Sequence, residues 1–558
     1  MKQVQNDFRL SRALEILLGI VVVLEIIAPV VCKTYGVDAP SQLNLESQFN
    51  AHIAQGVIFP RWMSEGFHGF GAPSFYFYPP LSFYSTAILS LITTVRDPWV
   101  LFQAVGLLAT IASFFSARKL LLTLGSNNYQ SIIGSMLYAF APYRVAELYS
   151  MSSLSSHVGY VFVPLVWCGI LQIVNNRNGS HAKGVILFAI SVALMLLSNI
   201  PLTLLTAVSI AIVGAVFWRK LDTKTIGQIG AGVILAALLA AFYLCSILAM
   251  RPNVQLGYLY KTREFFLDDL IHLRNLPGLY HVAILYTAIA AIAVGYWQAR
   301  KHKKELQSIE RIAIRAGLAI CLFIILLEIP FIGSPLLGSV PLLQLIQGTW
   351  RFYIDIVLLG AIVVGIAKSD AIKKAGRRIV WVMTLAAFPP VLLIVFNIHL
   401  YPHYIAAASD PFEYAPVYTL KNGAGLEAML HLHSEAPPAI VSYVIDNDRV
   451  DRVVKKPCME EYNANLSASR SVIFHRFFWP AWHLYSNERE IATLPDSIGR
   501  ATAVLPAGRY TLEWQLERTP LEVAGLWISG ISWSGILVFS GIGLVRWRVK
   551  KKRPTSLA

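Results

Sequence analysis

Residues 59–84 read "FPRWMSEGFHGFGAPSFYFYPPLSFY", a stretch in which aromatic rings, glycines and prolines crowd together beside the first apolar run of the chain. Aromatic side chains such as Phe75 and Tyr78 suit the interface between lipid and water, where amphipathic rings sit at headgroup level. The glycines of "GFHGFGAP" permit tight turns. Two interpretations follow: an aromatic belt that only anchors the protein, or an ordered shelf on which Arg61 and His68 meet a phosphate group.

Apolar runs flank this stretch and extend through most of the chain. Of the 558 residues, 56% are hydrophobic and 14% are charged, and the mean hydropathy is +0.56, which is too apolar for a soluble protein of this length. Runs of roughly 17 to 25 apolar residues, long enough to cross a bilayer as helices, recur from Ala13 to Trp547. The sequence therefore predicts a mostly α-helical, polytopic membrane protein.

The net charge of +15 is concentrated in short basic clusters between the apolar runs, such as "ARKHKK" and "IKKAGRR". This spacing marks cytoplasmic loops, so we do not expect nucleic-acid binding. With the N-terminus inside, Ala13–Cys32 is predicted to be a retained first span, and the polar segment Lys33–Pro80 follows it on the outer side. The next apolar piece, Leu81–Val95, is short, and we expect it to be a re-entrant or surface-lying helix.

The charge pattern also sets the number of spans. About twelve are predicted, with both termini in the cytoplasm of a bacterium whose inner membrane holds the protein; a count of thirteen is the alternative. The spans after the first are expected at about 99–117, 129–147, 158–174, 184–199, 201–218, 226–249, 279–297, 314–332, 352–367, 379–398 and 523–545.

One long polar region interrupts this pattern near the C-terminus. Alternating and β-branched runs, such as "ATAVLPAGRYTLEWQLE", are separated there by Pro, Gly and Asn, which predicts a small extracytoplasmic β-sandwich before the last helix. The predicted organisation is a multi-span domain over 1–398, with its first outer loop at 33–80, a β-rich domain over 399–522, and a final helix with a basic tail over 523–558.

Several short motifs occur in a particular order along the chain. They are Asp38-x3-Gln42, Gly56, Pro60-Arg61-Trp62, Gly69-x-Gly71-x-Pro73, Tyr78-Pro79-Pro80-Leu81, Pro142-Tyr143-Arg144 and Gln347-Gly348-Thr349-Trp350-Arg351-Phe352. This order resembles that of the YfhO-like integral membrane proteins, which belong with the C-class (GT-C) multi-span glycosyltransferases. The C-terminal "FFWPAWHLY" and "LPAGRYTLEW" also resemble the extracytoplasmic domain of that group.

The resemblance implies roles for individual residues. An acidic residue of the first outer loop would act as general base on the acceptor hydroxyl; Asp38 matches best and Glu46 is second. Outer arginines would stabilise the departing lipid phosphate: Arg61, Arg144 and, most of all, Arg351. The same resemblance places further substrate-binding residues at Gln42, Trp62, His68, Tyr78, His157, Gln347 and Trp350.

Structural roles remain open for the same charges. Arg351 could pair with Asp355 one helical turn later, and Arg144 with Glu147 at the i,i+3 spacing. A solvated loop acid is the alternative for Asp38 and for Glu46. The chain also departs from the family pattern, because Met151 and Ser156 stand where related proteins often carry Arg and Glu; His157 is a partial substitute.

These features predict transfer of a sugar from a polyprenyl-phosphate donor to an extracytoplasmic glycan, lipid or protein. The alternatives are a non-catalytic assembly partner for cell-surface polysaccharide and a transporter or flippase of a lipid-linked sugar. The expected partners are the lipid-linked donor and the membrane lipids, with the acceptor unknown. No cofactor is evident, and no His or Asp cluster has the spacing of a divalent metal site.

Overall fold

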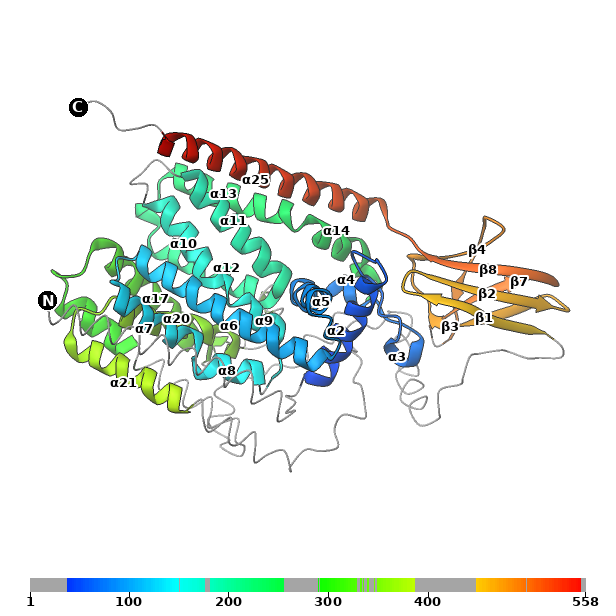
Figure 1. Ribbon diagram of the computed structural model, residues 1–558, viewed down its shortest axis with the longest axis horizontal. Helices are drawn as coiled ribbons and strands as arrows, with labels where there is room; N and C mark the ends of the chain where they lie inside the picture. The colour runs from blue at the N-terminus through cyan, green and yellow to red at the C-terminus, as the bar shows by residue number, and fades with distance from the viewer. Residues whose placement is uncertain are drawn as a thin grey trace.

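A computed structural model shows a helical body with a strand-rich region at one end (Figure 1). It describes residues 38–149, 151–175, 181–254, 292–328, 349–386, 448–497 and 499–552, and the single positions 290, 332, 333, 335, 339, 340 and 346. The predicted first span, Ala13–Cys32, lies outside these residues, as do most of 279–297 and 379–398.

Helices make up most of the described chain. Their bounds are α2 Ala39–Ala54, α3 Gly66–Gly69, α4 Ser74–Phe77, α5 Leu81–Thr93, α6 Pro98–Thr123, α7 Asn128–Ala139, α8 Pro142–Tyr149, α9 Leu154–Gly159, α10 Phe162–Val174, α11 His181–Ser198, α12 Ile200–Val216, α13 Thr223–Leu239, α14 Ala241–Met250, α17 Ser308–Glu328, α20 Tyr353–Gly365, α21 Asp370–Ala386 and α25 Pro520–Lys552, with 3₁₀ turns η1 Trp218–Lys220, η2 Arg251–Asn253 and η4 Thr349–Phe352.

Five of the described segments are long and apolar enough to cross a membrane, and a bent pair would make six. The five are Pro98–Thr123, Leu154–Val174, His181–Ser198, Ile200–Lys220 and Pro520–Gly541. The chain is thus an integral membrane protein, as predicted, and the count of twelve spans stays a prediction. Helix α5 has 13 residues, about 20 Å of helix against the roughly 30 Å of a bilayer core, which agrees with the expectation that it does not cross alone.

Two predicted spans are broken in the structure. The prediction of one helix over 129–147 is wrong: α7 ends at Ala139 and α8 begins at Pro142. Proline has no N–H to donate and disfavours helical backbone in the residue before it, so a helix stops here. The span predicted at 226–249 is also divided, because α13 and α14 meet at Ala240 with a bend of 71°.

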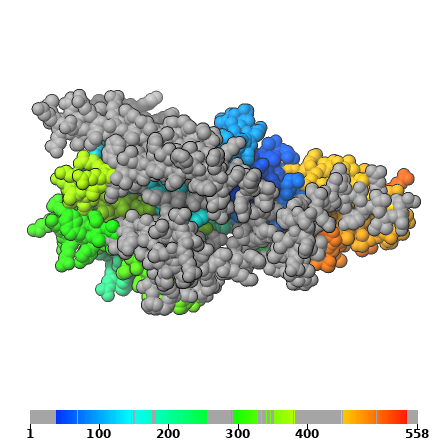
Figure 2. Space-filling view, turned by 90° about the horizontal axis from the view of Figure 1, so that it is seen from below, coloured from blue at the N-terminus to red at the C-terminus, as the bar shows by residue number. Residues whose placement is uncertain are grey.

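The strand-rich region contains two antiparallel sheets. One has the order β1-β2-β8-β4-β5 and the other the order β3-β7-β6. The strands are β1 Arg449–Lys456, β2 Met459–Leu466, β3 Arg470–Phe477, β4 Trp482–Ser486, β5 Arg489–Ile491, β6 Leu494–Pro495, β7 Arg500–Leu505 and β8 Gly508–Leu516. Figure 2 shows this region, in yellow and orange, at one end of the molecule.

The ring of Phe474 on β3 joins the two sheets. It packs edge-on against Tyr462 and Trp514 of the larger sheet, with centroid distances of 5.2 and 5.1 Å. An apolar core therefore lies between β3 and the β2–β8 pair.

The stretch 59–84 joins the helical body to the strands. Phe75, Tyr76 and Phe77 are buried in one hydrophobic cluster with the aromatic residues of the β region. Phe49 of α2 contacts Phe75 and Phe83 in the same cluster, at ring centroid distances of 5.3 and 5.4 Å. The prediction that these rings form an interfacial belt is wrong for the buried ones, because they pack between two parts of the protein.

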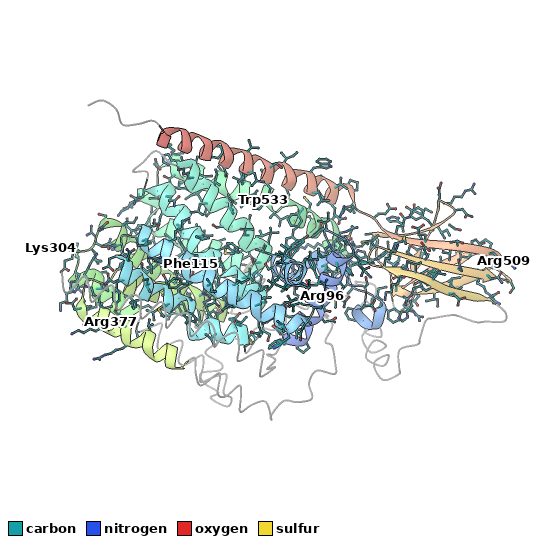
Figure 3. The ribbon with its side chains drawn as sticks, viewed as in Figure 1. Arg96, Phe115, Lys304, Arg377, Arg509 and Trp533 are labelled. Atoms are coloured by element: carbon teal, nitrogen blue, oxygen red, sulfur yellow. The ribbon has the colours of Figure 1, made fainter. Side chains whose placement is uncertain are left out.

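The basic clusters of the helical body and the β region lie at opposite ends of the molecule (Figure 3). Lys304 and Arg377 lie at the end of the helical body, and Arg509 of β8 lies at the opposite end (Figure 3). Lys304 and Arg377 belong to the basic clusters predicted to face the cytoplasm, whereas the β region is the part predicted to lie outside. The two are at opposite ends, as that topology requires.

Candidate functional site

The candidate site begins at the start of α2. Asp38 directly precedes the helix, and its backbone N–H donates a hydrogen bond to the carbonyl of Met151 at 3.2 Å. Pro40 lies in the first turn, where a missing N–H costs nothing. This bond ties the first outer loop to the connection between α8 and α9, so two segments far apart in sequence meet at Asp38.

Glu147 of α8 is the second acid of the site. Its side chain is only 5% exposed. The hydroxyls of Tyr143 and Tyr160 hydrogen-bond to its carboxylate and also lie 3.2 Å from each other. Two tyrosines therefore hold the carboxylate within the site.

Arg351 supplies positive charge near these two acids. It lies in η4, immediately before α20, and is half-buried. Its charge acts on both Asp38 and Glu147. Three charged side chains from the first outer loop, from α8 and from the start of α20 thus gather in one place.

The electrostatic balance differs between the two carboxyls. Burial raises the pKa of Asp38 above its usual value, and the nearby Arg351 charge opposes that rise. Burial also raises the pKa of Glu147; Arg351 opposes this rise, the negative charge of Asp38 adds to it, and the two tyrosine hydrogen bonds reduce it. Asp38 nevertheless keeps an exposed side chain. A carboxylate that solvent can reach, with a raised pKa, suits a general base.

Arg144 and His157 lie deeper than predicted. Arg144 is fully buried, donates to Ser113 Oγ at 2.9 Å, and lies over the rings of Tyr138 and Tyr160. These contacts replace the Arg144–Glu147 pair that was the predicted alternative. The arginine charge that acts on Glu147 is that of Arg351. His157 is also buried, with Nε2 2.8 Å from Thr110 Oγ1. Neither residue presents its polar group at the surface.

The proposed Arg351–Asp355 pair is likewise replaced. Asp355 is buried and accepts a hydrogen bond from Ser209 Oγ at 2.7 Å. The Arg351 charge acts instead on Asp38 and Glu147. The arginine therefore faces the outer acids, and Asp355 faces α12.

Arg61 is not placed to bind a phosphate. Its guanidinium forms an ion pair with Glu522 at 3.2 Å and also donates to Tyr76 Oη and to the carbonyls of Leu516 and Glu517. Both partners of the ion pair are buried, at 4% and 2% exposure. The prediction of a phosphate ligand is corrected to a structural clamp between the first loop and the C-terminal part of the chain.

The other predicted residues lie in three kinds of surroundings. Gln42 and Glu46 follow Asp38 at intervals of four on α2 and are buried, Glu46 completely. Burial puts the Glu46 carboxyl out of reach of an external ligand. Trp62 packs against Trp479 and Trp482, and Tyr78 against Phe83. Gln347 and the side chains of His68 and Trp350 lie outside the described residues.

Sequence reasoning missed Glu147 and Tyr160 as members of the site. Glu147 was weighed only as a local partner for Arg144, because spacing along a helix shows near neighbours and not contacts made by the fold. The signal that could have found it is its position three residues after the Pro142-Tyr143-Arg144 motif. Within the described residues, no group of three or more His, Cys, Asp or Glu side chains could hold a metal ion.

Comparison with known proteins finds likeness in structure. No protein-family model matches the sequence, and no curated protein does. Among solved structures, the mycobacterial arabinofuranosyltransferase AftD shares 16% identity over 70% of this chain and 27% of its own, with a TM-score of 0.44. The Archaeoglobus fulgidus oligosaccharyltransferase shares 11% over 78% and 62%, with a TM-score of 0.38.

A third solved structure is ArnT from Cupriavidus metallidurans bound to undecaprenyl phosphate. It shares 10% identity over 63% of this chain and 77% of its own, with a TM-score of 0.27. The chain spans about a quarter of AftD's length. At these identities and TM-scores the likeness concerns the fold and assigns neither a family nor a reaction to this chain.

Proposed function

We propose that the protein transfers a sugar from a polyprenyl-phosphate donor to an extracytoplasmic glycan, lipid or protein. The observation that carries this proposal is the meeting of Asp38, Glu147 and Arg351 at the outer start of α2. An exposed carboxylate is the group that such a reaction needs as base, and a cation beside it is what the departing phosphate needs.

Each residue then has a distinct part. Asp38 removes the proton of the acceptor hydroxyl as that oxygen attacks the anomeric carbon of the donor. The bond from that carbon to the phosphate oxygen breaks, and the lipid phosphate leaves with the electron pair. Arg351 stabilises the negative charge of the departing phosphate, while Glu147, held by Tyr143 and Tyr160, keeps Arg351 in place. We also propose that the two sheets form the predicted sandwich, which the contacts of Phe474 support.

The test is release of free polyprenyl phosphate from a panel of polyprenyl-phosphate sugars by the purified protein in liposomes, with candidate acceptors added. Asp38→Asn and Arg351→Ala are expected to lose turnover while keeping their fold, and Glu488→Gln on an exposed turn serves as the control. Turnover that survives Asp38→Asn would remove Asp38 as the base. No turnover by the wild type with any donor and acceptor would favour the assembly-partner or flippase alternatives.

A further inference from the structure

An apolar groove lies between α10, α12, α17 and α20. Its empty volume is about 1150 Å³, including the part open to the surroundings. Aliphatic and aromatic side chains line most of it, among them Trp167, Ile210, Val213 and Ile320, together with Gly214. The lining residues of α17 extend from Ile312 to Ile320, about 12 Å of helix.

Asp355 is the acid that lines this groove. It is 4% exposed, and its Oδ2 accepts the hydrogen bond from Ser209. Its Oδ1 has no hydrogen-bond partner among the residues that the structure describes. An acid within membrane-embedded protein is costly and marks a functional site unless it is paired, and the proposed transfer reaction does not use this one.

The groove has two chemically different ends. Ser209 bonds Asp355, so the acid lies at the level of Ile210 on α12, whereas Lys220 and Leu221 line the groove about three turns further along the chain. A chain seated in the groove with its polar end at Asp355 would therefore run along apolar side chains toward Lys220. Oδ1 is an acceptor, so that polar end must carry a hydrogen-bond donor.

A hydroxyl fits this position better than an ammonium group. Ser209 already shows a hydroxyl at hydrogen-bond distance from the same carboxyl. Burying a hydroxyl costs far less than burying a charge, and the desolvation of an ion pair can exceed the attraction within it. We propose that the groove binds a single-chain lipid alcohol, with its hydroxyl on Asp355 Oδ1 and its hydrocarbon chain along α12 and α17. This site is independent of the proposed transfer reaction.

Trp167 provides a direct readout, because it lines the groove. The probes are an undecanol brominated along its chain, the matching brominated amine and the matching brominated alkane, added to the purified full chain in detergent. Bromine quenches tryptophan on contact, and the signal of Trp167 is the difference between the wild type and Trp167→Phe. We expect saturable quenching by the alcohol, with an affinity at least about fivefold above that of the alkane, as one hydrogen bond gives.

Two pairs of variants test the position. A Cβ at Gly214 would meet open space, so Gly214→Phe fills the groove without displacing the backbone and should abolish the saturable signal. Gly230→Phe on α13, which also meets open space but does not line the groove, should leave it unchanged. Asp355→Leu should bring the alcohol down to the affinity of the alkane, whereas Asp355→Asn, which keeps an acceptor oxygen, should retain alcohol binding within a few fold.

Thermal unfolding in the same detergent shows whether each variant is folded, and only folded variants are compared. Equal affinity for alcohol and alkane would overturn the role of Asp355. Binding of the amine alone would overturn the hydroxyl as the ligand group. Quenching that persists in Gly214→Phe would overturn the groove as the site.

Discussion

Asp38 and Glu147 are two carboxyl groups near one arginine that differ in their exposure to solvent. Asp38 is open to solvent and Glu147 is buried with two tyrosines, yet the same Arg351 charge acts on both. Such a group titrates as a unit, so the acid limb of a pH profile belongs to the cluster. The exposed member is the one that an acceptor can reach.

The two neighbours of Asp38 should act differently on this acid limb. The Arg351 charge lowers the pKa of Asp38, so its removal in Arg351→Gln should move the acid limb of kcat/KM to higher pH. The charge of Asp38 raises the pKa of Glu147, whereas Glu147 is not among the charges that shift the pKa of Asp38, so Glu147→Gln should leave the limb nearly in place. The measurement is the pH dependence of kcat/KM for residual turnover. A limb that moves as far in Glu147→Gln as in Arg351→Gln would contradict this account of the cluster.

Glu46 should make stability depend on pH. Burial raises its pKa well above the usual value, and neither carboxyl oxygen has a hydrogen-bond partner within the described part of the chain. Since the folded pKa exceeds the unfolded one, stability is full below about pH 4 and is lost as the pH rises through the folded pKa. Glu46→Gln should therefore gain Tm relative to wild type as the pH rises from about 4 to 8. The exposed Glu488→Gln should show no such trend, and an equally flat difference for Glu46→Gln would refute the prediction.

Motifs in the sequence singled out Asp38 and Arg351 as candidates, although no spacing shows that they meet. Glu147 and Tyr160 join them only through the fold. The phosphate role of Arg61 failed for the same reason, since its partners Leu516, Glu517 and Glu522 lie more than 450 residues away. Local sequence patterns therefore indicated which types of residue form the candidate site. They could not show which residues contact one another, because the fold makes those contacts.

Among the elements, the glycine-rich turn of residues 63–72 is closed by two backbone hydrogen bonds between Met63 and Ala72, at 2.7 and 3.0 Å. Gly71 lies inside it with φ +81°, and an added Cβ would lie 2.1 Å from Trp62 Nε1. The sequence predicted tight turns from these glycines. It could not predict that one of them makes room for a buried indole.

Gly71→Ala should destabilise the protein more than Gly56→Ala. Gly56 has φ +86° with open space beside it, so alanine there should cost only the left-handed backbone term, about 1–2 kcal/mol. Gly71→Ala adds the overlap with Trp62, which should cost about a further 2 kcal/mol. Thermal unfolding of the two variants in one detergent measures the difference. Equal losses of stability in the two variants would mean that Trp62 moves aside at little cost in free energy.

Helix breaks were the least predictable elements. The hydropathy of 129–147 and of 226–249 reads as continuous, yet the structure divides both. Pro142 was a visible signal for the first break. The bend between α13 and α14 carries no proline, and α25 packs against both helices, so contact with a distant helix accompanies the bend.

On the scale of the whole molecule, the Arg61 clamp holds the first loop to the end of the β region and the start of α25. The predicted division of the chain into membrane and β-rich parts remains an expectation, but the aromatic cluster and this clamp give the two parts a shared core. Composition indicated the helical membrane protein and the β-rich segment. It could not show that the first loop packs between them.

Breaking the clamp should loosen the β region from the helical body. Glu522→Ala leaves Arg61 as a buried charge without its acid, which typically costs about 3–5 kcal/mol. Asp370→Ala breaks an exposed pair with Lys373 and should cost about 0–1 kcal/mol. Thermal unfolding and limited proteolysis measure both effects. A Glu522→Ala protein as stable and as protease-resistant as Asp370→Ala would show that the clamp is dispensable.

The clamp also sets an order for biosynthesis. Arg61 leaves the ribosome 461 residues before Glu522, so at synthesis rates of about 5–20 residues per second its partner appears roughly half a minute to a minute and a half later. During that time the loop that follows Asp38 lacks its final support. The candidate site is thus completed only when nearly the whole polypeptide has been made, and a prematurely terminated chain would insert its helices without acquiring a finished site.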